Sequence, residues 1–363
     1  MKKLSLIFLG FIIFFAYGLG VGTYEWFPFQ EIRKITNFIE GDSEFIKFKN
    51  SKEIKLVYEK PSVEKIKSLR KKINLFLVPK VDNSKISFIE KDSNQQIISV
   101  NYYGVNVNAI LSKTNKKNSE CLRIYIQGHR GDPFNFNFHN EILNNSLEKG
   151  CDFLSFSMIG IGLNQGPSFY PSRRGKVFLD SFQSTLHRNY SQFFSVENPN
   201  LDPLSLFIWP HAKIINEIKN NYTDIKVMGI SGGGWYALWL SVLFPEIKTT
   251  ISYAASLPFV YLKFSRNMSD WENQFSNVYN HISYLDLYYL SSFSSAKLNY
   301  RESYLIYNTN DPCCYMNPYA QDFKDKMKNL NFSNLKIIVD ESNEHSMNVE
   351  LVNKILDHLI LEN

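Results

Sequence analysis

A serine between glycines is the first feature of the sequence that could carry chemistry. Residues 229–233 read Gly-Ile-Ser-Gly-Gly, which fits the pattern G-x-S-x-G with Ser231 at its centre. The apolar run before it is typical of a strand, and the longer run after it is typical of a buried helix. Between a strand and a helix, this pattern holds a serine on a sharp, strained turn from which the hydroxyl projects. We therefore expect Ser231 to be a nucleophile; the alternative is a tight glycine turn.

A nucleophilic serine needs a base to take its proton. His345 follows the last predicted strand, 335–342, and precedes the last predicted helix, so it should reach the sheet edge that carries Ser231. It is the predicted base. The other histidines are interpreted as surface or core residues, since a single histidine in a turn, a helix or an irregular stretch rarely acts as a base: His129, His139, His187, His211, His281 and His358.

The base in turn needs an acid that fixes its tautomer and stabilises its cation. Asp311 ends the strand-like run 303–311 just before Pro312, which gives the chain order serine, acid, histidine. Its competing interpretation is the turn residue of an Asp-Pro pair. Asp286 is the alternative acid. The two acidic residues nearest to the histidine in sequence are too close to be good partners: Asp340 and Glu341.

The glycine-rich turn QGHRGDP, residues 127–133, follows the strand-like run 122–127. Its glycines let backbone N–H groups face the space above the serine. We expect the oxyanion to be bound by the N–H of Gly232 together with that of Arg130 or His129. Losing one such donor costs about 10²- to 10³-fold in rate. Arg130 could instead bind an anionic group of the substrate or lie in solvent.

Strands and helices alternate along the chain from residue 121 onward. This order predicts a mostly parallel sheet covered by helices on both faces. Before residue 121, the runs 53–59, 85–90 and 96–111 alternate like strands. The run 62–76 has the spacing of a helix. Further along the chain a helix is predicted over 203–221, and Pro210 should kink or divide it. The aromatic segment 257–302 is too long for a simple crossover and is either a lid-like insertion or extra core packing.

The runs GHRG, GISGGG, NDPCC and EHS together resemble the α/β-hydrolase fold, in its serine esterase, lipase and peptidase branch. The resemblance covers residues 97–363 and implies an α/β protein with an eight-stranded, mostly parallel sheet. It further implies that no cofactor is needed and that Ser231, Asp311 and His345 are nucleophile, acid and base. The loop departs from the usual His-Gly dipeptide, and it is similar to a turn of membrane-associated hydrolases that deacylate lipid-linked glycans.

The N-terminus predicts an association with a membrane. Two lysines precede an uncharged run, residues 4–22, which is close to the length that a spanning helix needs. Aromatic residues follow it directly, as at a membrane interface: Tyr24, Trp26 and Phe27. We favour an anchor over a cleaved signal segment for residues 1–23; either places the body outside the cytoplasm. Residues 24–96 form an extension of unknown role.

The cysteines and the charge limit the remaining possibilities. Cys121 and Cys151 each precede a strand-like run, and two parallel neighbours would bring them within bridging distance, so a disulfide and two buried thiols stay equally open. Adjacent Cys313 and Cys314 could form a vicinal ring. No cysteine or histidine spacing suggests a metal site.

The net charge of +5 is spread thinly, which gives no support for nucleic-acid binding.

The sequence therefore predicts a membrane-anchored, extracytoplasmic serine hydrolase that cleaves carboxylic esters through an acyl-enzyme. Its substrate would be a small-molecule, lipid or glycan ester. Two alternatives are a peptidase of the same fold and a non-catalytic interaction protein on this scaffold.

Overall fold

The computed structural model describes residues 54–129, 131–164, 168–172, 175–179, 203–265, 270–293, 300–315, 318–330, 332 and 334–358. The predicted membrane segment 4–22 lies outside the described residues, as do Arg130 and His187. No helix of the described ranges combines the length and the apolar character needed to cross a bilayer.

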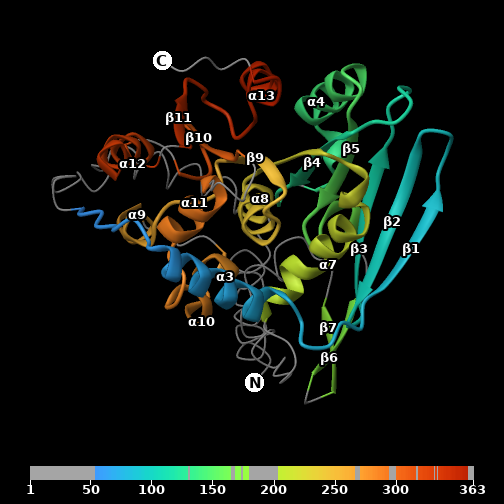
Figure 1. Ribbon diagram of the computed structural model, residues 1–363, viewed down its shortest axis with the longest axis horizontal. Helices are drawn as coiled ribbons and strands as arrows, with labels where there is room; N and C mark the ends of the chain where they lie inside the picture. Colours follow the sequence, from blue (N-terminus) through green and yellow to red (C-terminus); the bar gives the residue numbers. More distant parts are fainter. Residues whose placement is uncertain are drawn as a thin grey trace, which may run out of the picture. The chain divides into compact units, whose positions relative to one another are not determined.

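A nine-stranded sheet forms the centre of the protein (Figure 1). Its strands are β1 (Lys85–Glu90), β2 (Gln95–Tyr102), β3 (Val105–Ser112), β4 (Cys121–Gln127), β5 (Asp152–Ser157), β8 (Asp224–Ile230), β9 (Ile247–Tyr253), β10 (Glu302–Asn308) and β11 (Leu335–Asp340). They lie in the order β1-β2-β3-β5-β4-β8-β9-β10-β11. A separate two-stranded sheet pairs β6 (Ser168–Ser172) with β7 (Gly175–Leu179).

The six strands β5, β4, β8, β9, β10 and β11 run parallel to one another, whereas β1, β2 and β3 pair antiparallel and β3 is also antiparallel to β5. The predicted mostly parallel sheet is therefore confirmed, with one strand more than expected. The additional strand is β1, which pairs with β2 from Lys85 opposite Asn101 to Glu90 opposite Gln96. The sheet thus begins before the boundary predicted at residue 97, and Leu56–Asn363 forms one compact unit.

Helices cover both faces of the sheet, as predicted (Figure 1). On one face α4 (Asn137–Glu148) and α13 (Val349–Leu356) pack against each other and over the strands. On the other lie α3 (Val63–Leu77), α7 (Pro203–Ile218), α8 (Gly232–Leu243) and α11 (Tyr284–Ser292). The other α-helices within the described ranges are α9 (Phe259–Ser265), α10 (Ser276–Tyr279) and α12 (Tyr319–Met327).

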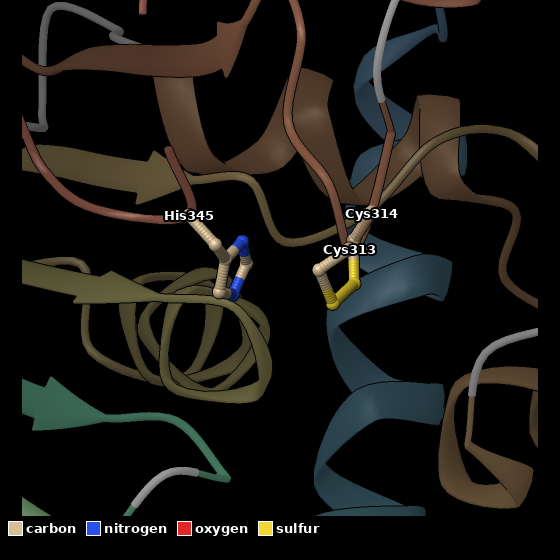
Figure 2. A group of neighbouring side chains, drawn as sticks. All are labelled: Cys313, Cys314 and His345. Atoms are coloured by element: carbon tan, nitrogen blue, oxygen red, sulfur yellow. A yellow bond between two sulfur atoms is a disulfide. The ribbon is translucent and has the colours of Figure 1, made fainter. Parts of the chain in front are cut away.

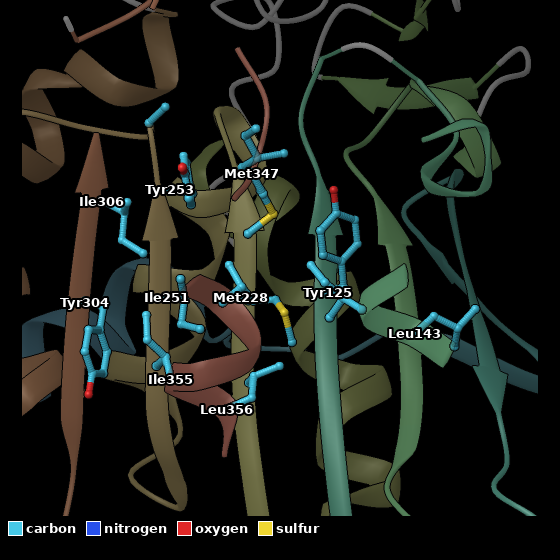
Figure 3. Close-up of a cluster of buried hydrophobic side chains, with 14 of the residues drawn as sticks. Tyr125, Leu143, Met228, Ile251, Tyr253, Tyr304, Ile306, Met347, Ile355 and Leu356 are labelled. Atoms are coloured by element: carbon cyan, nitrogen blue, oxygen red, sulfur yellow. The ribbon is translucent and has the colours of Figure 1, made fainter. Parts of the chain in front are cut away.

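Alternate residues of the central strands build the core beneath α4 and α13 (Figure 3). Met228 and Ile230 of β8 point to this face together with Ile251 of β9, as the two-residue period of a strand requires. Ile142 of α4 and Ile355 of α13 meet them from above, each fully buried. On the opposite face α8 is buried from Gly232 to Val242, because it is apolar all round.

The segment predicted as an insertion, residues 257–302, contributes partly to the core. Every residue of α11 is buried, and this helix packs against α8. The aromatic character of the segment is explained there by packing, since Tyr284 lies among the rings of Tyr279, Tyr288 and Phe259.

One local prediction was wrong, and one of the two alternatives for Pro210 is excluded. Residues 54–59 form no strand, although they alternate; Tyr58 instead stacks on the ring of Phe332, and the segment pairs with no strand of the sheet. Pro210 does not divide α7, which continues through it from Pro203 to Ile218. Packing of the apolar side chains of α7 outweighs the missing hydrogen bond at the proline.

A disulfide joins Cys121 and Cys151, whose Cα atoms lie 4.6 Å apart. The parallel register of β4 and β5 pairs Leu122 with Asp152, so the cysteine preceding each of these residues stands beside the other. This settles the pairing that the sequence left open. Cys313 and Cys314 are also joined by a disulfide.

Candidate active site

Ser231 stands alone between β8 and α8 in a strained backbone conformation. Its φ is 56° and its ψ is −131°, a combination that residues other than glycine rarely adopt. A Cβ added to Gly229 would lie 2.3 Å from the carbonyl oxygen of Gly233, and one added to Gly233 would lie 2.0 Å from that of Ile126. The strand and the helix can meet this sharply only because both positions lack a side chain, as the motif predicts.

His345 and Asp311 meet at the edge of the sheet. The Nδ1 atom of His345 donates to Oδ2 of Asp311 over 2.7 Å. The side chain of His345 is 5% exposed and that of Asp311 is fully buried. A carboxylate only accepts hydrogen bonds, so Nδ1 is the donor of this pair, and in a neutral imidazole of this tautomer Nε2 carries the lone pair. This is the arrangement that a general base requires.

The ends of two neighbouring strands bring these residues together. Asp311 comes shortly after β10 and His345 shortly after β11, and these strands are adjacent and parallel. Asn308, the last residue of β10, donates from Nδ2 to the carbonyl oxygens of Glu344 and Ser346 at 2.6 and 2.9 Å. It thereby holds the loop on both sides of His345. Sequence reasoning missed Asn308, whose only signal is an amide side chain at the end of a buried strand.

The other oxygen of Asp311 is held by its own turn. Oδ1 accepts from the backbone N–H groups of Cys313 and Cys314, at 2.8 and 3.0 Å. Asp311 is thus both the turn residue that the Asp-Pro pair suggests and the partner of His345. These contacts leave the carboxylate little freedom to rotate.

The glycine-rich turn after β4 lies against Ser231, because β4 and β8 are neighbours in the sheet. A Cβ added to Gly128 would lie 2.8 Å from the Cβ of Ser231 and 3.3 Å from the backbone nitrogen of Gly232. The imidazole of His129 also lies near Gly232, since a Cβ on Gly232 would lie 2.9 Å from Cε1 of His129. Arg130 lies outside the described residues.

His129 also links this turn to the segment after residue 257. Its Nε2 lies 3.0 Å from Oδ2 of Asp270, and both side chains are partly exposed. One atom each of His129, Asp270 and the buried Glu272 lie within 4.8 Å of one another, a group that could hold a metal ion. Atoms of Cys313, Cys314 and His345 also lie within 4.8 Å of one another, but both sulfur atoms belong to the disulfide and offer no thiolate to a metal ion.

Asp286, the alternative acid, is engaged elsewhere. It occupies the third position of α11, where Oδ2 accepts from the backbone N–H and the hydroxyl of Ser283. Its Oδ1 accepts from the hydroxyl of Tyr58 at 3.1 Å. Asp340, which lies near His345 in sequence, accepts a hydrogen bond from the side chain of Asn348. The hydrogen-bond partner of His345 is therefore Asp311, and not Asp286 or Asp340.

Two of the remaining histidines are buried within the fold. His139 contacts the hydroxyl of Ser155, and His211 lies near the carbonyl oxygens of Phe207 and Ser157. Burial lowers the pKa of each imidazole to about 4, against the weaker opposing effect of the hydrogen bonds. Both rings are therefore neutral core residues near pH 7, as the sequence suggested.

No protein-family model matches the chain, and no curated protein matches its sequence. Solved structures do match. Methylesterase BT1017 is 14% identical with a TM-score of 0.50, over 81% of this chain and 62% of that one. An acetyl xylan esterase from Paenibacillus sp. R4 is 14% identical with a TM-score of 0.49, over 87% and 98%. Acetyl xylan esterase 1 from Thermoanaerobacterium sp. JW/SL YS485 is 13% identical with a TM-score of 0.49, over 82% and 94%.

The chain has an α/β-hydrolase fold. In this fold the candidate residues lie on the serine turn between β8 and α8 and on the two loops after β10 and β11. At this level of identity the likeness concerns the fold alone, so activity and substrate are argued separately.

Proposed function

We propose that the protein is a serine hydrolase that cleaves carboxylic esters with Ser231, His345 and Asp311. The observation that carries the proposal is the 2.7 Å hydrogen bond from His345 Nδ1 to the buried carboxylate of Asp311. A buried acid that holds an imidazole in one tautomer, at the sheet edge where a serine sits in a strained turn, matches the requirements of acyl transfer.

In the proposed reaction the hydroxyl of Ser231 attacks the carbonyl carbon of an ester. Nε2 of His345 takes the hydroxyl proton and then gives it to the departing alcohol, which leaves an acyl-enzyme. Water attacks this intermediate with His345 again acting as base, and Ser231 is restored. Asp311 stays ionised throughout and stabilises the imidazolium.

The negative charge that forms on the carbonyl oxygen needs fixed donors. We assign this role to the N–H of Gly232 and to one N–H of the preceding loop, from His129 or Arg130. The contact distances around Gly128 support the assignment, because they leave no room between this loop and the nucleophile turn. Backbone donors require no reorganisation during the reaction.

Esters are proposed as substrates in preference to amides. The name of the structural neighbour methylesterase BT1017 supports this choice. Acylated glycans or lipids close to a membrane surface are the proposed class.

We further propose that residues 4–22 anchor the protein in a membrane with the hydrolase outside the cytoplasm. The length of the uncharged run and the aromatic residues after it support the anchor. The disulfide between Cys121 and Cys151 supports an oxidising compartment. Fractionation of cells into membrane and soluble parts, with and without residues 1–23, tests this proposal; equal distribution of the two proteins would contradict it.

Labelling with a fluorophosphonate probe tests the catalytic proposal. The full chain should be labelled on Ser231, and labelling should vanish in Ser231→Ala and fall sharply in His345→Ala. Ser87→Ala, at an exposed serine of β1, is the matched control and should be labelled like the parent protein. A folded protein without label at Ser231 indicates a non-catalytic interaction protein.

Unlabelled protein from the same preparation is then offered p-nitrophenyl esters and aminoacyl amides, because a label on Ser231 would block turnover. Faster turnover of the esters agrees with the proposal. Faster turnover of the amides identifies a peptidase instead.

A further inference from the structure

The turn that follows β10 contains a disulfide whose two residues both hold the proposed catalytic acid. Oδ1 of Asp311 accepts from the backbone N–H groups of Cys313 and Cys314, and Oδ2 accepts from His345. The two cysteines are adjacent in sequence and are joined through their sulfur atoms. The bridge and the acid are therefore part of one small hydrogen-bonded unit.

Figure 2 shows the disulfide beside the imidazole of His345. The sulfur atoms of Cys313 and Cys314 and a ring nitrogen of His345 lie within 4.8 Å of one another. Neither cysteine is buried, so a small reductant can reach the bridge. The disulfide closes a ring that contains the peptide bond between the two cysteines, and this ring limits how the N–H of Cys314 can be oriented.

We propose that the Cys313–Cys314 bridge is a redox-sensitive positioning element for Asp311 and, through it, for His345. This inference rests on the proposed hydrolase function and concerns the regulation of that same site. With the bridge closed, both amides converge on Oδ1 and leave Oδ2 for the imidazole. With the bridge open, the turn gains freedom, the carboxylate can rotate, and His345 spends less time in the orientation that activates the serine.

Opening the bridge requires an external dithiol. A thiolate of the dithiol attacks one sulfur atom, the Cys313–Cys314 bond breaks, and a mixed disulfide forms. The second thiol of the reagent then attacks the mixed disulfide and releases the protein sulfur as a thiol. The reagent leaves as a cyclic disulfide. The protein takes up two electrons and two protons and ends with two thiols.

The second disulfide supplies an internal control. The Cys121–Cys151 bridge joins the starts of β4 and β5, whereas Ser231, Asp311 and His345 follow the ends of their strands. Because the strands are parallel, the two sets of residues lie at opposite ends of the strands, the disulfide at the amino ends and the candidate catalytic residues at the carboxyl ends. Reduction of this bridge should change the stability of the protein without reorienting Asp311.

The experiment compares the full chain before and after treatment with dithiothreitol, and mass spectrometry reports which bridge is open. We expect kcat for a p-nitrophenyl ester to fall on the order of 10-fold when Cys313–Cys314 opens, as for the loss of one well-formed hydrogen bond in the site. The Cys121→Ser/Cys151→Ser variant should keep this response. The Cys313→Ser/Cys314→Ser variant should have the low kcat from the start and no response. An unchanged kcat on opening of the Cys313–Cys314 bridge overturns the inference.

A second readout does not depend on activity. The Nδ1 proton that bridges His345 and Asp311 should give a strongly downfield NMR resonance, identified by its absence in His345→Gln. This resonance should weaken or shift when Cys313–Cys314 is reduced and should not change when only Cys121–Cys151 is absent. A resonance that is the same in both redox states contradicts the inference, even in a protein that folds and is labelled normally. Failure of the hydrolase proposal shows differently, as a missing fluorophosphonate label in the oxidised protein.

Discussion

At the scale of single residues, Asp311 uses its two carboxylate oxygens for two separate tasks. One oxygen accepts from the turn that follows the residue, and the other accepts from His345. The turn fixes the carboxylate, and the carboxylate fixes the imidazole. A residue that looks from sequence like an ordinary Asp-Pro turn former is thus well suited to orient a base.

The comparison of Asp311→Asn with Asp286→Asn tests this assignment. Replacing the acid by an amide favours the wrong tautomer of His345, so kcat should fall about 10³- to 10⁴-fold while the fold is retained. Asp286→Asn weakens the start of α11 and the contact with Tyr58, so kcat should stay close to that of the parent protein and the unfolding free energy should fall by about 0.5–2 kcal/mol. Ester kinetics and urea denaturation measure the two effects. The reverse pattern would assign the acid to Asp286.

The sequence predicted these residues unequally, for a physical reason. The turn around Ser231 is specified by its own glycines and by the flanking strand and helix, so local reasoning found it. His345 and Asp311 followed from chain order in a sheet of parallel strands. Asn308 was missed because its role depends on carbonyl groups 36 and 38 residues away, which no local pattern encodes.

At the scale of elements, the site depends on how closely β4, β8 and α8 approach one another. α8 starts at Gly232, directly after Ser231, and Gly233 lies against the backbone of β4. The same approach places the glycine-rich turn after β4 beside the nucleophile. The alternation of strands and helices predicted this neighbourhood. It did not predict that residues 54–59 stay outside the sheet, because alternation alone cannot tell whether a partner strand is free.

Gly233→Ala tests the closeness of these elements. The added Cβ would lie 2.0 Å from the carbonyl oxygen of Ile126, a backbone atom that cannot move without moving β4. We expect a loss of about 1–3 kcal/mol in unfolding free energy, together with a loss of fluorophosphonate labelling as the turn shifts. Ser241→Ala is a control on the same helix, since it removes a hydroxyl oxygen and adds no atom. A Gly233→Ala protein with unchanged stability and labelling would show that α8 has room to move.

At the scale of the whole molecule, the α/β-hydrolase fold buries two neutral imidazoles that take no part in the proposed chemistry. His139 packs between α4 and β5, and His211 packs beneath α7 against the ring of Tyr236. Burial lowers the pKa of both to about 4, whereas an imidazole in the unfolded chain titrates near 6.5. Folding is therefore coupled to pH through residues remote from Ser231 in sequence.

The sign of this coupling follows from proton binding. Between pH 6.5 and 4 the unfolded chain holds protons on these histidines that the folded protein does not, so the free energy of unfolding rises with pH across this window. The stabilisation is complete above pH 6.5 and is lost progressively as the pH falls to about 4. At about 1.4 kcal/mol for each pKa unit, each histidine contributes up to about 3 kcal/mol to the change.

Urea denaturation between pH 4 and 8 measures the prediction. The slope of unfolding free energy against pH should become shallower in His139→Gln and in His211→Gln, since a glutamine binds no proton in either state. His281→Gln, at an exposed position, should leave the slope unchanged. In the double variant the effects of the two substitutions on the slope should be nearly additive, because the two histidines lie on opposite faces of the sheet. A slope that neither buried substitution alters would mean that both imidazoles bind protons equally in the folded and the unfolded protein.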